Sequence, residues 1–171
     1  MAKPRVSLHD RLSALSLDQI ASSLGAESDR ACGVLGAALL DAKLELLFRR
    51  RLGPNGERLL GKSAPLGSFS SRIRLAYALG WISDDAHADL DTVRDIRNDF
   101  AHDFDLDLGF ESGSIADRCR NLRCSQAFLD GHDDWASKPE NNVSTQVIHG
   151  MRDVLKPPRW RFRLAIEFLA Q

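Results

Sequence analysis

The segment from Leu66 to Phe104 constrains the fold most, because it encodes two helices on either side of a clear break. Residues between Ile73 and Leu79 are mostly apolar, which predicts a first helix at about 69–80 that is buried on almost every side. The break falls at Gly80 to Ser83, and a second helix is predicted at 84–103. Two adjacent helices of this kind need apolar partners, so the segment favours a helical bundle.

The second of these helices is predicted to be amphipathic. Its core stripe follows a spacing of three or four residues and consists of Leu90, Val93, Ile96, Phe100 and Phe104. Another face carries an acidic residue at every fourth position, namely Asp91, Asp95, Asp99 and Asp103. We therefore expect one face in the core and the acidic face in water.

The longest helix is predicted at 29–52, where Ser28 caps its start and Gly53-Pro54 ends it. The capping box Ser16-x-x-Gln19 predicts a shorter helix just before it, at 17–24. The apolar stripe of the longest helix is predicted on Leu35, Ala38, Leu39, Ala42 and Leu46, widened by Leu40, Leu44, Leu47 and Phe48. Two glycines, Gly33 and Gly36, would let a neighbouring helix approach closely.

Beyond the central helices, residues 103–110 alternate with a period of two and predict a short extended or irregular arm. Further helices are expected at 114–129 with Ser114 as cap, at about 147–155, and after Pro157-Pro158. We expect residues 1–12 to be flexible and 130–144 to be the least ordered internal stretch. The predicted fold class is all-α, a single-domain helical bundle spanning residues 1–171.

Composition narrows the function classes. The 171 residues are 43% hydrophobic and 27% charged, as in an ordinary globular protein, and the net charge of −1 disfavours binding of nucleic acid through overall positive charge. The odd count of three cysteines, without a C-x-x-C pair, predicts reduced thiols rather than disulfides or zinc. The sequence has no apolar run long enough for a membrane span. We expect a soluble, cytoplasmic protein with no cofactor, no metal and no membrane partner.

A block of motifs carries a family resemblance. It comprises Pro65-Leu66-Gly67, Ser71-Arg72-Ile73, Leu75 to Gly80, Ile82-Ser83, Asp89-Leu90, Arg97 and Phe100-Ala101-His102. In order and spacing this block resembles the mannitol operon repressor (MltR-like) family, and the segment from Pro158 to Ile166 resembles it more weakly. The resemblance implies an all-helical protein linked to transcriptional repression, without an obvious DNA-reading module.

A second, local resemblance implies a different function. The string Arg97-Asn98-x-x-x-His102 is similar to the signature of HEPN-superfamily ribonucleases. That resemblance implies metal-independent cleavage of RNA in a dimer cleft, with Arg97, Asn98 and His102 as catalytic residues. An imidazole can transfer protons and a guanidinium can stabilise a phosphorane. On a regular helix, however, side chains five positions apart point about 140° away from each other.

Structural interpretations compete with each candidate site. Arg97 could pair with the acidic residues around it, and His102 could favour the negative end of the helix; a phosphate-binding but non-catalytic site is a third possibility. His87, Asp91 and Asp95 share a helix face at metal-ligand spacing, but a solvated acidic stripe is the simpler interpretation. Asp103-x-Asp105-x-Asp107 lacks the later residues of a calcium loop.

Direct DNA binding is doubtful, because no helix-turn-helix is recognisable. The basic clusters are Arg49 to Arg51, then Arg118, Arg120 and Arg123, then Arg159, Arg161 and Arg163. The primary hypothesis is a mannitol-repressor-like transcriptional regulator that acts through protein association, as a homodimer with a protein partner that is itself DNA-bound. The alternative is the HEPN-type ribonuclease, with RNA as its partner.

Overall fold

Helices form nearly all of the regular structure in the computed structural model, which describes residues 15–61, 63–136 and 157–171. They are α2 (Leu17–Ala26), α3 (Asp29–Leu52), the 3-10 helix η1 (Pro54–Leu59), α4 (Phe69–Ala78), α5 (Asp84–His102), α6 (Gly113–Arg120), α7 (Arg123–Ala136) and α9 (Pro158–Leu169). The described part of the chain contains no strand, which confirms the predicted all-α class.

The predicted starts of the first two helices are confirmed by their caps. Ser16 and Gln19 form the reciprocal hydrogen bonds of a capping box at the start of α2, and Ser28 Oγ accepts from the Ala31 amide at the start of α3. Gly53 follows α3 with a φ of +62°, a conformation that suits glycine. Local capping chemistry therefore fixes these boundaries.

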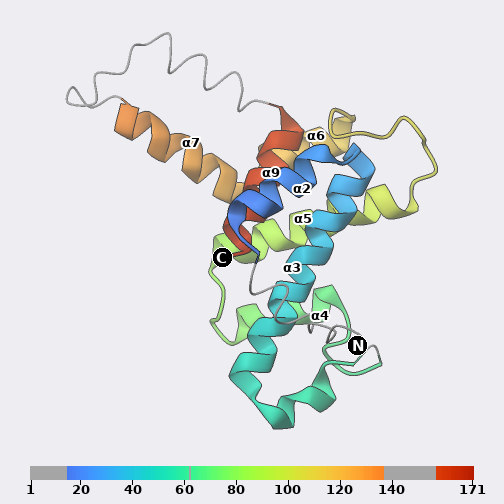
Figure 1. The fold of residues 1–171 in the computed structure, drawn as a ribbon, viewed down its shortest axis with the longest axis vertical. Coiled ribbons are helices and arrows are strands. Elements are labelled where there is room, and N and C mark those ends of the chain that lie inside the picture. The colour runs from blue at the N-terminus through green and yellow to red at the C-terminus, as the bar shows by residue number, and fades with distance from the viewer. Residues whose placement is uncertain (1–14, 62, 137–156) are drawn as a thin grey trace, which may run out of the picture.

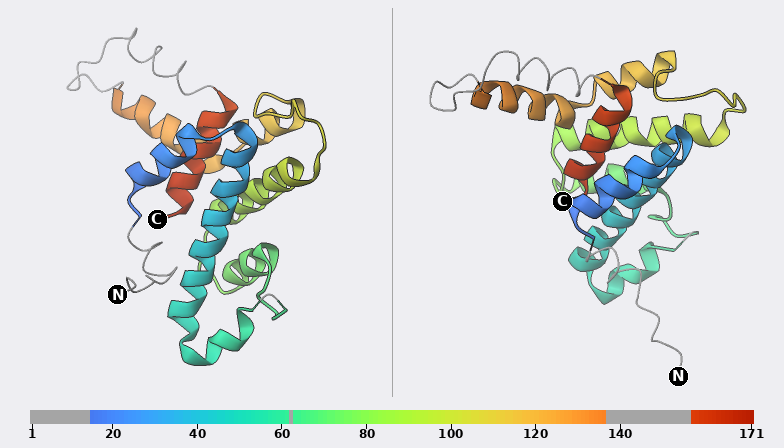
Figure 2. Two further views of the ribbon diagram at one scale, coloured as in Figure 1. Left: turned by 45° about the vertical axis from the view of Figure 1, so that its right-hand side comes forward. Right: turned by 45° about the horizontal axis from the view of Figure 1, so that its top comes forward.

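α3 is the central element, crossed by α5 and α9 (Figures 1 and 2). A Cβ atom on Gly33 would lie 2.2 Å from the Phe100 ring of α5, and one on Gly36 would lie 3.0 Å from the Phe162 ring of α9. The prediction that these glycines allow close approach is confirmed. The core is built where the three helices meet.

The predicted apolar stripe of α3 was partly wrong. Leu35 is 48% exposed and Ala38 is also exposed, whereas Leu46 is buried as expected. The buried face contains the predicted Leu40, Leu44, Leu46 and Phe48, and also Cys32, Gly33, Gly36 and Ala37, which were not part of the predicted stripe. Because the small residues allow the crossing helices in, the core lies along the glycine face rather than along the face of Leu35.

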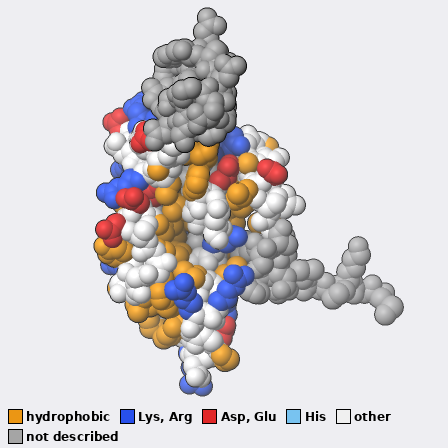
Figure 3. Space-filling model, turned by 90° about the vertical axis from the view of Figure 1, so that its left-hand side faces the viewer, with side chains coloured by type: hydrophobic (Ala, Val, Ile, Leu, Met, Phe, Trp, Pro, Cys, Tyr) orange, Lys and Arg blue, Asp and Glu red, His pale blue; other side chains and the backbone are white. Residues whose placement is uncertain are grey.

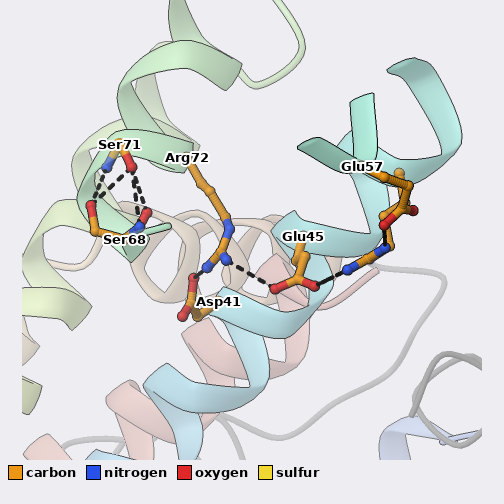
Figure 4. Close-up of polar contacts among 7 residues, drawn as sticks. Asp41, Glu45, Glu57, Ser68, Ser71 and Arg72 are labelled. Atoms are coloured by element: carbon orange, nitrogen blue, oxygen red, sulfur yellow. Dashed lines mark hydrogen bonds and ion pairs between the residues drawn. The ribbon is translucent and has the colours of Figure 1, made fainter. Parts of the chain in front are cut away.

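α4 is helical as predicted but it is not buried on almost every side. Ile73 and Ala76 face the core, while Tyr77 and Leu79 are 41% and 47% exposed. The buried charge on α4 is Arg72, which is 5% exposed and donates to Asp41 and, at 2.9 Å, to Glu45 on α3 (Figure 4). Pairing with two carboxylates compensates for the removal of this guanidinium from water.

The core stripe of α5 is confirmed up to Phe100 and fails at Phe104. Leu90, Val93, Ile96 and Phe100 are at most 3% exposed, whereas Phe104 is 96% exposed. The helix ends at His102, so the following residues leave the three-to-four spacing. Residues 103–110 form the predicted irregular arm, which extends away from the bundle at the right of Figure 1.

The single helix predicted at 114–129 is in fact two helices, α6 and α7, separated at Asn121 and Leu122. Ser114 does not cap either of them, because Ser112 precedes α6. The carboxylate of Asp89 on α5 accepts from the amides of Arg123 and Cys124, both at 2.8 Å, and so caps the start of α7. Asp89 is 1% exposed. Because it lies on α5, far from α7 in the sequence, local sequence patterns do not reveal that it caps α7.

Several predictions lie outside the described residues: the flexible start at 1–12, the helix near 147–155 and most of the stretch at 130–144. α7 continues through 130–136. No helix among the described residues is long and apolar enough to cross a membrane.

Candidate functional site

Arg97 and Asn98 lie together on the last turns of α5. The Arg97 Nη1 atom donates to Asn98 Oδ1 at 3.0 Å, and Arg97 is exposed. Both residues line a groove of about 420 Å³ that α3, α5 and the start of α4 enclose, with Phe69, Ser70 and Arg94 in its wall. A guanidinium, an amide and a hydroxyl at one groove can hold an anion by hydrogen bonds.

His102 does not line this groove. It is the last residue of α5 and it is exposed, and Phe104 does not seal it because that side chain is itself exposed. A single chain therefore brings Arg97 and Asn98 together, but does not bring His102 into the same groove. The catalytic role of these three residues stays a prediction.

The acidic residues that flank Arg97 pair with other arginines. Arg94 contacts Asp95 at 2.9 Å and Asp91 at 2.5 Å, and Arg118 from α6 pairs with Asp99. The pairs of Arg94 lie within α5, and the pair of Arg118 joins α5 to α6. The structural interpretation of Arg97 as a partner of Asp95 or Asp99 is thus not what the structure shows.

The face of α5 with metal-ligand spacing holds its own pairs. The Nε2 atom of His87 lies 3.6 Å from Asp91 Oδ2, and the imidazole stacks on the Tyr77 ring with centroids 4.1 Å apart. Asp95 faces Arg94 instead. Across residues 15–61, 63–136 and 157–171, no three His, Cys, Asp or Glu side chains are placed to hold a metal ion.

The three cysteines are free thiols, and Cys32 and Cys119 are fully buried. Burial raises the pKa of the Cys32 thiol to about 11 and that of Cys119 to about 12. For Cys124, burial and a hydrogen bond with Asp89 raise the pKa to about 12. Thiols with such pKa values remain protonated near neutral pH, so they are poor nucleophiles.

The arginine clusters that could contact nucleic acid are used inside the molecule. Arg159 pairs with Asp29 at 2.5 Å, and it and Arg163 donate to backbone carbonyls of α2. Arg161 donates to the Arg120 carbonyl at 2.8 Å. In the other clusters, Arg118, Arg120 and Arg123 pair with Asp99, Asp117 and Asp85, Arg49 pairs with Glu45 and Glu57, and Arg51 lies over the Trp81 ring.

A larger cavity, of about 630 Å³, lies between α3, the start of α5 and the end of α9, and it is lined mainly by leucines with Trp81 and Phe168. Lys43 and Arg50 also line it. Figure 3 shows hydrophobic side chains gathered in a band down one side of the molecule, with Lys and Arg side chains beside it. Sequence reasoning did not predict this cavity, because its wall comes from four separate segments.

Comparisons with known proteins identify the family of this chain. A family model described as the mannitol repressor, MtlR, matches residues 56–155, more than half of the chain. This chain belongs to the mannitol repressor family. The family resemblance drawn from the motifs is confirmed. None of these matches is to a HEPN ribonuclease, so the second resemblance stays a prediction. No curated protein matches the chain in sequence.

Two solved structures share the fold of this family member. A possible transcriptional regulator, YggD from Shigella flexneri 2a strain 2457T, has a TM-score of 0.65 at 18% identity, covering 91% of this chain and 96% of its own. The structure of the MtlR–HPr complex from Escherichia coli gives a TM-score of 0.60 at 20% identity, covering 90% and 95%. At these identities the likeness shows a common fold.

Proposed function

We propose that this mannitol repressor family member is a transcriptional regulator that acts by binding a protein partner rather than by reading DNA itself. The observation that carries the proposal is that the arginines of the clusters at 118–123 and 159–163 contact carboxylates and carbonyls of their own molecule. Side chains that pair with carboxylates and carbonyls of their own molecule contribute little to a phosphate-binding surface, on which affinity for DNA depends.

The comparisons support a protein partner and suggest which one to test. A structure of the same fold, MtlR of Escherichia coli, is a complex with HPr. Family membership and a shared fold make HPr the first partner to test for this chain, and the net charge of −1 is compatible with a protein partner. Because the proposed regulator does not read DNA itself, it would repress transcription through a second protein that is bound to DNA.

The test measures binding of the purified full chain to HPr and to a mixed-sequence duplex DNA under the same conditions. We expect a saturable complex with HPr by isothermal titration calorimetry, and no shift of the DNA in an electrophoretic assay at about 0.15 M salt. Failure to bind HPr, or tight binding to the DNA, would contradict the proposal. Light scattering of the same sample tests the predicted homodimer.

The ribonuclease alternative stays a prediction with its own experiment. RNA is incubated in a metal chelator with the full chain or with the His102→Ala variant, whose substitution lies at an exposed position. Cleavage by the full chain that the variant lacks would support catalysis by His102. If the full chain leaves RNA intact, the alternative is removed and the regulatory proposal remains.

A further inference from the structure

Two large apolar side chains are almost completely exposed on the loop that follows α5. Phe104 is 96% exposed and Leu106 is 93% exposed, whereas the other exposed large hydrophobic residues in the described part of the chain lie between 37% and 48%. Side chains of this size add nothing to the core of their own molecule when they stand fully in water. Adjacent exposed apolar groups of this kind mark interaction surfaces.

The backbone of this loop is held in place from α3. The guanidinium of Arg30 donates to the carbonyls of Phe100, Asp103 and Asp105, the last two at 3.0 and 2.7 Å. Inside the loop, Asp103 Oδ1 accepts from the Asp105 amide at 2.9 Å, and Asp105 Oδ1 accepts from the Asp107 amide at 3.0 Å. These contacts hold the backbone that carries the two apolar side chains.

The far end of the loop is anchored in the core. Phe110 is 1% exposed, and its ring lies 5.1 Å from the Phe100 ring and 5.0 Å from the Phe162 ring. Its amide donates to Asp29 Oδ2 at 2.9 Å. A loop fixed at both ends loses little conformational entropy when a partner covers it, which favours binding.

The charge of the loop restricts its partner. Asp103, Asp105 and Asp107 alternate with the two apolar residues, and none of the three carboxylates forms an ion pair with a described residue. Arg30 is occupied by the carbonyls. A surface with this much negative charge repels nucleic acid phosphates and anionic lipid, but attracts a protein surface that carries Lys and Arg.

We propose that residues 103–108, the acidic apolar loop, form the docking surface for the protein partner, which has an apolar socket rimmed by Lys and Arg. Phe104 and Leu106 fill the socket, and the three carboxylates face its basic rim. This inference rests on the proposed function, and HPr is the probe. The core-and-rim arrangement is typical of energetically important contacts in protein interfaces.

The experiment titrates HPr against the full chain and three double variants. Phe104→Ser with Leu106→Ser removes the apolar pair, and Asp105→Asn with Asp107→Asn removes charge but keeps the side-chain acceptor that holds the turn. The matched control is Leu35→Ser with Leu79→Ser, two apolar residues that are half exposed elsewhere on α3 and after α4. Circular dichroism melts establish that all variants fold.

We expect the apolar double variant to lower the affinity for HPr by about 30-fold or more, as the loss of an interface hot spot does. The charge variant should lower it several-fold and flatten its dependence on salt. The control should bind as the unmodified chain does. Binding that is unchanged in the apolar variant would overturn the docking surface while the proposed function stands.

Two other outcomes are also decisive. If the unmodified chain does not bind HPr, the proposed function is overturned and the docking surface with it. If light scattering shows that the unmodified chain self-associates and that the apolar variant is monomeric, with HPr binding unaffected, the loop contacts a second copy and the inference is wrong.

Discussion

Phe100 and Phe104 are one helical turn apart in the sequence but occupy opposite environments. Phe100 is completely buried between Gly33 of α3 and the ring of Phe110, while Phe104 is 96% exposed on the acidic apolar loop. The end of α5 at His102 lies between them. The comparison shows that apolar spacing identifies core residues only as far as the helix that produces the spacing continues.

The largest expected effect comes from exchanging each of these two residues for alanine. Phe100→Ala should lower the free energy of unfolding by about 3–5 kcal/mol, because it leaves a cavity at the crossing of α3 and α5. Phe104→Ala should change it by less than about 0.5 kcal/mol, because nothing in the core touches the side chain. Urea denaturation of the pair measures both, and equal losses would mean that Phe104 packs in solution.

The next largest effect is expected at Asp89, and it tests whether this buried residue of α5 caps the start of α7. Asp89→Ala should lower the free energy of unfolding by about 1–3 kcal/mol, because the partly buried amides of Arg123 and Cys124 lose their acceptor. Asp89→Asn retains one acceptor oxygen and should give an intermediate loss.

The control is Asp117→Ala, which removes an exposed carboxylate that pairs with Arg120 on the same helix. A surface pair of this kind contributes less than about 1 kcal/mol. If denaturation shows the same small loss for Asp89→Ala as for the control, Asp89 is not the cap that separates α6 from α7.

Local chemistry made much of the fold predictable. Ser16, Ser28 and Gly53 determine where helices begin and end through contacts within a few residues, and these boundaries were predicted correctly. The break between α6 and α7 was missed because its cap, Asp89, is more than 30 residues away in sequence. The exposure of Leu35 was missed because the packing of α5 and α9 against glycines selects the buried face of α3.

Less of the candidate site was predictable. The sequence identified Arg97 and Asn98, which do lie side by side, but it could not show that His102 lies outside their groove. Phe104 was wrongly predicted to end the core stripe of α5, and Leu106 gave no separate signal, since an apolar residue in an alternating stretch also fits an ordinary strand. The backbone that carries them is bonded to Arg30 of α3, a residue more than 70 positions away in the sequence.

A third substitution, expected to lower stability less than Phe100→Ala or Asp89→Ala, tests what holds the loop that carries the exposed Phe104. Arg30→Ala should lower the free energy of unfolding by only about 1 kcal/mol, because the carbonyls of Asp103 and Asp105 are near water and can be hydrated. The loop itself should become mobile, with NMR order parameters of residues 103–107 falling from about 0.85 to below about 0.6.

Arg74→Ala is the matched control, because Arg74 is an exposed arginine on α4 and lies far in sequence from the loop. It should leave those order parameters unchanged. If the loop is as rigid in Arg30→Ala as in the control, Asp103 and Asp105 hold it through their own turns. If it is mobile in the unmodified chain, Phe104 and Leu106 are exposed because the loop is loose, and a partner would have to order them at an entropic cost. If the loop is rigid in the unmodified chain and mobile only in Arg30→Ala, then α3 fixes the position of the buried Phe100 and also that of the exposed Phe104.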